Sequence, residues 1–81
     1  MQYSFQQFAQ LKGINLLRDD IIFLRVSLSK VPYNARRSTL QRYAEIWVGA
    51  MRNCGDHIKK DNVGRAAANY WLRERIESQD R

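Results

Sequence analysis

The hydrophobic positions of this chain recur at the three- and four-residue spacing of amphipathic helices. The pattern is most regular over 34–53 and 61–79, two long stretches that we expect to pair as antiparallel helices through Gly55. Two shorter helices are predicted before them and are expected to pack across that pair. The sequence therefore predicts an all-α fold, a compact bundle of two short N-terminal and two longer C-terminal helices, within one domain covering 1–81.

Local signals mark the ends of the two short helices. Ser4 and Gln7 have the spacing of a capping box, and Gly13 follows the first helix where a left-handed residue would close it. Asn15 is the expected N-cap of the second helix, and Pro32 disfavours helix at the residue before it. The second helix is expected to be the most buried element, because its apolar positions are Leu17, Ile21, Ile22, Phe23, Leu24, Val26 and Leu28. A strand over 21–26 is the alternative, since β-branched residues are frequent there.

The third helix is predicted to begin at Asn34 or Ser38, where Ser38 and Gln41 repeat the capping-box spacing. Gly55 supplies its end. Its expected buried face consists of Leu40, Tyr43, Ala44, Trp47, Ala50, Met51 and Cys54.

The fourth helix is predicted to begin at Asp56 or Asp61. Its expected buried face consists of Val63, Ala66, Ala67, Tyr70, Trp71 and Ile76, with Leu72 beside it. Gly64 costs about 1 kcal/mol relative to Ala within a helix, so the first turn is expected to fray or to begin later.

Positive charges outnumber negative ones: 14 Lys and Arg stand against 8 Asp and Glu, for a formal net charge of +6. Most of the cations are arginines, whose planar guanidinium matches phosphate and carboxylate better than a lysine ammonium does. This balance favours an anionic partner. The 44% share of hydrophobic residues argues against disorder, and 4 Gly with 1 Pro are too few turn signals for a many-stranded sandwich or barrel.

The sequence shows no recognisable reaction centre. Cys54 is the single cysteine, so no intrachain disulfide can form, and Cys54 with His57 supplies only half of a zinc site. Asp19 and Asp20 lie in the first turn of a predicted helix, where negative charge complements the helix dipole. We therefore expect a non-enzymatic protein without a catalytic residue, metal or cofactor.

Targeting signals are not visible either. The first residues lack the charged and apolar regions of a signal peptide, and the longest apolar run, Ile21–Leu24, is far shorter than a membrane span. We expect no membrane association and a cytoplasmic location.

The most specific candidate site is the pair Arg36 and Arg37 at the entrance of the third helix. Together with Ser38, Thr39 and the backbone amides of that helix end, two guanidiniums would form an anion site. The alternative is that both arginines precede the helix cap and lie in solvent.

A second candidate site is the row formed by Arg65 and Arg73, eight residues apart on one face of the last helix with Asn69 between them. Lys59 and Lys60 lead into that row. Glu74 and Glu77 interrupt the surrounding surface, as on an ordinary solvated face. The aromatic residues offer base-stacking platforms, but their spacing is more typical of a core; they are Tyr43, Trp47, Tyr70 and Trp71.

A helix-turn-helix arrangement around 8–14 is disfavoured, because its second helix would present Asp19 and Asp20 to a phosphate backbone. The leading hypothesis is a non-enzymatic nucleic-acid-binding accessory or regulatory protein, of the kind found in mobile elements. Its expected contacts with the phosphates of DNA or RNA are Arg36, Arg37, Arg42, Lys59, Lys60, Arg65 and Arg73. The alternative is a protein-interaction module, an adaptor or inhibitor that docks a basic helical face on an acidic protein surface. A homodimer is kept open as an alternative to a monomer.

Overall fold

The computed structural model describes residues 4–79, which form four α-helices and one short 3-10 turn. In chain order the elements are α1 (Phe5–Lys12), α2 (Arg18–Ser29), the 3-10 turn η1 (Tyr33–Ala35), α3 (Arg36–Arg52) and α4 (Lys60–Gln79). The predicted all-α bundle is confirmed, and the strand alternative for 21–26 is wrong, because that segment lies within α2.

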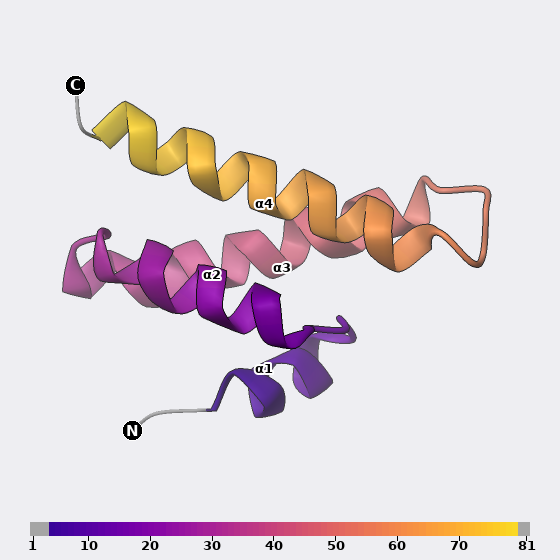
Figure 1. Cartoon of the computed structure of the whole chain (residues 1–81), viewed down its shortest axis with the longest axis horizontal. Helices are drawn as coiled ribbons and strands as arrows, with labels where there is room; N and C mark the ends of the chain where they lie inside the picture. The colour runs from indigo at the N-terminus through magenta and orange to yellow at the C-terminus, as the bar shows by residue number, and fades with distance from the viewer. Residues whose placement is uncertain (1–3, 80–81) are drawn as a thin grey trace.

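α3 and α4 pack side by side, and α4 lies along the upper edge of the view in Figure 1. The two helices run antiparallel, and their contact is the most extensive between any two elements. α2 packs against both of them. The molecule measures 36 × 31 × 19 Å, so its shortest dimension corresponds to about two helix diameters. Within residues 4–79, no helix combines the length and apolar content needed to cross a membrane.

The predicted ends of α1 are confirmed. The Ser4 hydroxyl accepts a hydrogen bond from the Gln7 amide at 3.1 Å, and the Gln7 side chain accepts one from the Ser4 amide at 3.2 Å. Gly13 adopts φ 71°, a left-handed conformation that costs glycine little. Both signals act between residues close in sequence, so they do not depend on tertiary contacts.

The start of α2 differs from the prediction. Leu17, not Asn15, is the N-cap, and its amide donates to Asp20 Oδ2 at 2.9 Å. In the segment before it, Ile14 and Leu16 are buried in the core. The expected burial of α2 is also wrong in part, because Ile22 and Val26 keep more than half of their surface exposed. These two lie on the side of the helix opposite Leu24 and Leu28, which enter the core.

α3 follows directly from η1 and begins at Arg36. The second capping box is therefore wrong: Ser38 lies inside the helix, and its hydroxyl donates to the Ala35 carbonyl at 3.1 Å. The predicted buried face is confirmed at its centre, where Tyr43 and Trp47 are 0% exposed. These two side chains are the largest in the core.

The prediction for the buried face of α4 is correct at Leu72 and Ile76 and wrong at other positions. Its buried residues recur every fourth position, namely Gly64, Ala68, Leu72 and Ile76. Val63 and Tyr70, expected inside, are 40% and 63% exposed. The reason is that Gly64 packs directly against the indole of Trp47. A side chain at position 64 would clash with that ring, so this rotation of α4 against α3 requires glycine there. Gly64, which was expected only to weaken the helix, is thus a point of close packing between α4 and α3.

Candidate anion-binding groove

A groove with a volume of about 1320 Å³ lies between α1, α2, η1 and the start of α3. Its apolar lining consists of Phe5, Phe8, Leu11, Ile21, Leu28, Tyr33 and Leu40. Its charged lining consists of Lys12, Arg25, Arg36 and Arg37, and no Asp or Glu is among its described lining residues. We refer to it as the cationic groove.

Two turns bring the walls of the cationic groove together. Gly13 ends α1 and lets Ile14 donate its amide back to the Ala9 carbonyl at 3.1 Å, so that the chain reverses toward α2. Val31, 1% exposed, anchors the turn between α2 and η1. As a result the last residue of α1, Lys12, and the first residue of α3, Arg36, line one concavity although they are far apart in sequence.

Arg36 is held in place by the end of α2. Its Nε donates to the Val31 carbonyl at 3.0 Å, and its Nη2 donates to the Ser29 carbonyl at 3.4 Å. These oxygens belong to the last turn of α2 and the residues after it, where carbonyls lack helical partners. The same guanidinium lies 5.5 Å from the centroid of the Tyr33 ring. Arg36 therefore stabilises the turn after α2, and its positive charge remains at the edge of the groove.

The other cations of the groove are more exposed. Arg37 and Lys12 lie at the surface, and the Arg25 guanidinium is 6.0 Å from the centroid of the Phe5 ring. The two ion pairs among the described residues, Arg42–Glu45 and Arg65–Asp20, involve none of the groove cations. No carboxylate of residues 4–79 thus neutralises the groove at close range.

The hydroxyls expected to take part in an anion site at the entrance of α3 are engaged within the protein. Thr39 Oγ1 donates to the Ala35 carbonyl at 2.7 Å, as Ser38 Oγ does. The amide of Arg36 bonds the Tyr33 carbonyl, and the amide of Ala35 bonds the Pro32 carbonyl. These four donors all bond carbonyls of the 3-10 turn or of the residue before it.

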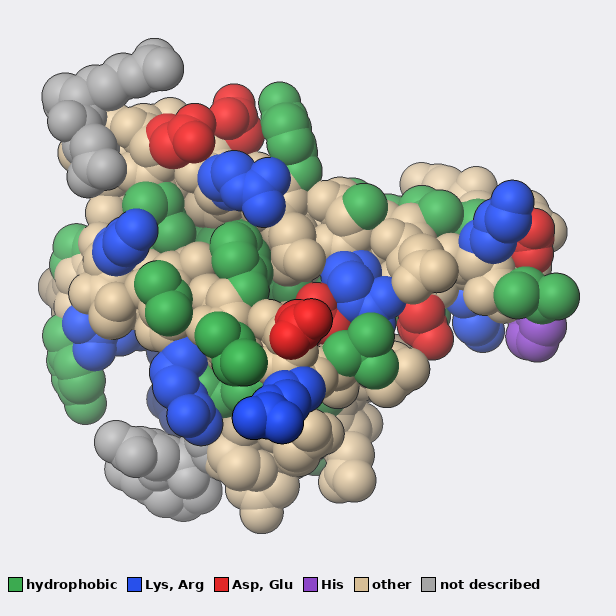
Figure 2. Space-filling view, viewed as in Figure 1, with side chains coloured by type: hydrophobic (Ala, Val, Ile, Leu, Met, Phe, Trp, Pro, Cys, Tyr) green, Lys and Arg blue, Asp and Glu red, His purple; other side chains and the backbone are tan. Residues whose placement is uncertain are grey.

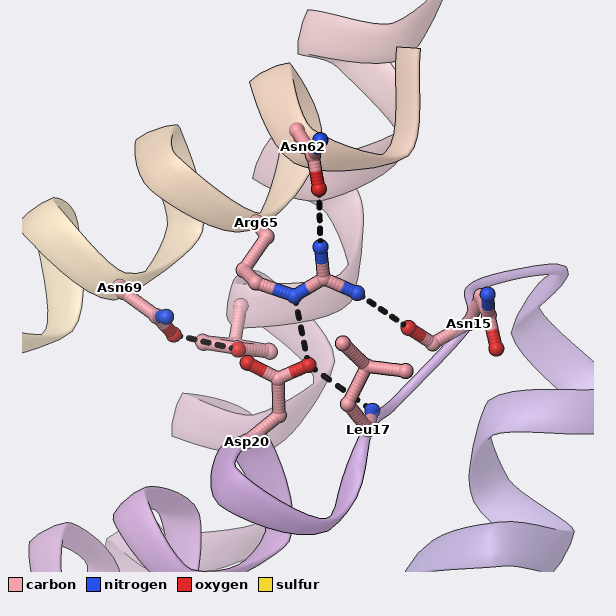
Figure 3. A network of polar contacts seen from close by, with 7 residues as sticks. Asn15, Leu17, Asp20, Asn62, Arg65 and Asn69 are labelled. Atoms are coloured by element: carbon pink, nitrogen blue, oxygen red, sulfur yellow. Dashed lines mark hydrogen bonds and ion pairs between the residues drawn. The ribbon is translucent and has the colours of Figure 1, made fainter. Parts of the chain in front are cut away.

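Arg65 is engaged inside the protein (Figure 3). Its Nε lies 2.7 Å from Asp20 Oδ2, and the two side chains are 17% and 4% exposed. Nη1 donates to Asn62 Oδ1 at 2.7 Å and Nη2 donates to the Asn15 carbonyl at 3.0 Å. The guanidinium also lies 5.1 Å from the centroid of a Trp47 ring. Each nitrogen of this guanidinium donates to a protein partner, so Arg65 links α4 to the start of α2.

Each residue of the row 65, 69 and 73 contacts another helix or the segment before α2, although Arg73 is exposed. Asn69 Oδ1 accepts a hydrogen bond from the Tyr43 hydroxyl at 2.6 Å. The Arg73 guanidinium lies 5.8 Å from the centroid of the Phe23 ring on α2. Burial raises the pKa of the Tyr43 phenol above its ordinary value, and the nearby Asp20 carboxylate raises that pKa further. The predicted alignment of the row is observed, but Arg65 and Asn69 make contacts within the bundle.

The remaining predicted cations lie away from the cationic groove. Arg42 pairs with Glu45 at 3.0 Å on an exposed part of α3. Lys59 and Lys60 lie beyond the opposite end of α3, whose 17 residues span about 25 Å. Figure 2 accordingly shows Lys and Arg side chains distributed from one end of the molecule to the other, not gathered in one stripe. Of the seven predicted residues, the structure brings Arg36 and Arg37 together.

Cys54 and His57 lie in the loop between α3 and α4. The Cys54 thiol is 3.4 Å from the Asp56 carbonyl, and His57 is exposed. Among residues 4–79, no group of three or more His, Cys, Asp or Glu is arranged to hold a metal ion.

Three groove residues escaped sequence reasoning: Lys12, Arg25 and Tyr33. Their proximity depends on tertiary packing, although a tyrosine directly after Pro32 and outside the helical pattern is a usable signal for an exposed aromatic residue. Comparisons with protein-family models, curated proteins and solved structures give no match to this chain. The chemistry of the groove is therefore the basis of the functional inference.

Proposed function

We propose that this protein is a non-enzymatic nucleic-acid-binding accessory or regulatory protein that holds phosphates in the cationic groove. The observation that carries the proposal is the convergence of four cations from three helices on one concavity, with no carboxylate among its described lining residues. Lys12, Arg25 and Arg37 would contact phosphate directly. Arg36 would contribute its charge from a fixed position.

Electrostatics support this assignment. A concave surface lined by one sign of charge concentrates the potential, which attracts an anionic polymer and accelerates association. Three of the four cations are arginines, whose fork of donors matches phosphate oxygens. Because the Arg36 guanidinium is already restrained by the Val31 and Ser29 carbonyls, little entropy is lost there on binding.

The test is a titration of fluorescently labelled DNA and RNA, read by anisotropy at several salt concentrations. Binding through three or four phosphates predicts a log–log slope of about −2 to −4. The double variant Lys12→Gln/Arg37→Gln is expected to reduce affinity and the magnitude of the slope. Lys59→Gln/Lys60→Gln is the matched control, since it also removes two positive charges, but beyond the far end of α3. We expect it to have little effect on affinity.

Three results would contradict the proposal in different ways. Absence of binding at low salt by the wild-type protein would reject nucleic-acid binding. Equal losses in the two double variants would indicate diffuse attraction to the net charge of +6, without a role for the groove. Retention of full affinity by the groove variant alone would place the site elsewhere.

The second candidate function is a protein-interaction module that docks a basic helical face on an acidic partner. The exposed apolar residues of α2 favour it: Ile22 is 52% exposed and Val26 is 54% exposed, on the same side of the helix. Recovery of one partner after nuclease treatment, abolished by Ile22→Gln with Val26→Gln, would support this function. Recovery that depends on intact nucleic acid would support the first. Light scattering would distinguish a homodimer from a monomer in either case.

A further inference from the structure

Tyr33 is an exposed aromatic side chain at the mouth of the cationic groove. It is 82% exposed, more than Tyr70 at 63%, and it lines the groove whereas Tyr70 does not. Exposure of so large an apolar ring has no packing benefit for the fold. An aromatic face presented to solvent beside cations is the arrangement by which proteins stack unpaired bases.

Tyr33 lies in a hydrogen-bonded turn beside a guanidinium that is itself held by hydrogen bonds. Tyr33 is the first residue of η1, a turn in which the Ala35 amide donates to the Pro32 carbonyl at 2.9 Å. The Arg36 guanidinium lies 5.5 Å from the ring centroid and is itself bonded to the Val31 and Ser29 carbonyls. The turn fixes the backbone that carries the ring, and the Arg36 guanidinium lies beside the ring, while most of its surface stays accessible.

We infer that the groove binds a single-stranded nucleic acid, with one unpaired base stacked on Tyr33 and the neighbouring phosphate on Arg37, beside the fixed charge of Arg36. This inference rests on the proposed function and adds the class of nucleic acid. Bases in a duplex are stacked on one another inside the helix, so they cannot cover a tyrosine ring, whereas a single strand exposes them. The apolar side chains between the cations favour bases over a fully hydrated phosphate backbone.

The experiment measures binding of labelled oligothymidylate and oligouridylate of about 12 nucleotides, and of a duplex of matched length, at one low salt concentration. The variants are Tyr33→Ala, Tyr33→Trp, Arg37→Gln and, as a matched control, Tyr70→Ala. Circular dichroism verifies that each variant is folded. The two single strands decide between DNA and RNA, which share the chemistry of base and phosphate.

We expect Tyr33→Ala to weaken single-strand binding at least fivefold and to leave duplex binding within twofold of the wild type. Tyr33→Trp should retain single-strand affinity, and Tyr70→Ala should change nothing. Arg37→Gln should weaken binding to every probe. Wild-type affinity for the duplex equal to that for both single strands would overturn the inference.

Failure of the inference and failure of the proposed function give different results. If Tyr33→Ala binds single strands within twofold of the wild type while Arg37→Gln does not, the groove binds phosphate but no base stacks on Tyr33. If wild-type protein binds none of the probes, the proposed function fails as well. If Tyr70→Ala weakens binding as much as Tyr33→Ala, the contact is not specific to the groove, and the inference is overturned.

Discussion

Gly64 on α4 lies against Trp47 on α3 so closely that a Cβ atom built on the glycine would be 2.5 Å from Trp47 Cδ1 and 2.9 Å from the Trp47 carbonyl oxygen. The second contact is with backbone, which cannot move aside as the end of a flexible side chain can. This contact between α3 and α4 therefore requires a residue without a side chain.

Gly64→Ala is expected to destabilise the protein although alanine is the better helix former. The propensity gain is about 1 kcal/mol, and overpacking of a tight core costs about 1–3 kcal/mol, so the net change is expected to be unfavourable. Chemical denaturation followed by circular dichroism measures it. Gly49→Ala is the matched control, because nothing lies within 4 Å of a Cβ at that position on α3. It should stabilise the protein by about 0.5–1 kcal/mol; equal effects of the two substitutions would exclude the steric account.

A buried ion pair joins α2 to α4 through Asp20 and Arg65, which are 45 residues apart. Asp20→Asn should lower the free energy of unfolding by about 2–4 kcal/mol, because it leaves a largely buried guanidinium uncompensated. Replacing both residues, Asp20→Asn with Arg65→Met, should cost less than the sum of the two single changes. The exposed pair of Arg42 and Glu45 supplies the comparison, since Arg42→Gln should change stability by about 0.5 kcal/mol or less. Additive effects of the buried pair would contradict the predicted coupling.

The sequence predicts those features that depend on residues close to one another along the chain. The capping box of Ser4 and Gln7 and the left-handed Gly13 are examples, because their partners lie within four residues. The apolar spacing around Tyr43 and Trp47 likewise identifies the buried face of α3. In each case a local pattern agrees with the tertiary structure.

The features that the sequence did not predict depend on distant partners. The hydrophobic pattern predicted that Tyr70 is buried, but it is exposed. Gly64 was expected only to weaken the helix, because its packing partner, the Trp47 indole, belongs to another helix. The identity of the ion-pair partner of Arg65 is hidden for the same reason. Arg36 and Arg37 were recognisable as adjacent cations, but their meeting with Arg25 requires the packing of α2 beside α3.

Tyr43 provides a prediction for the pH dependence of stability. Its pKa is raised chiefly by burial and further by the Asp20 carboxylate, while Arg65 lowers it. The phenol therefore stays protonated in the folded protein at pH values where the unfolded chain ionises. The stability that depends on this neutral form is complete below the pKa of the unfolded phenol and is lost as pH rises above it, so thermal unfolding should shift to lower temperature above about pH 10.

Tyr43→Phe tests the origin of that alkaline loss. Near neutral pH the variant should be less stable by about 1 kcal/mol, since it lacks the hydrogen bond to Asn69. Above the pKa of the unfolded phenol the difference should shrink, because phenylalanine has no proton to lose. Unfolding curves of both proteins from about pH 8 to about pH 11 measure the gap. A gap that stays constant over this range would show that the alkaline loss arises at other groups.

Arg36 and Arg37 are adjacent in sequence, and their contacts predict different roles. Arg36→Gln removes two bonds to the carbonyls of Val31 and Ser29, and we expect it to lower the free energy of unfolding by about 1–2 kcal/mol. Arg37→Gln removes an exposed side chain, and its effect on stability should be within about 0.5 kcal/mol. Denaturation measures both variants, and oligonucleotide titration of the folded proteins measures their binding. Equal losses of stability in the two variants would show that the hydrogen bonds of Arg36 to the Val31 and Ser29 carbonyls do not stabilise the fold. A loss of affinity in Arg37→Gln at unchanged stability would show that Arg37 acts in binding, whereas Arg36 acts in stabilising the fold.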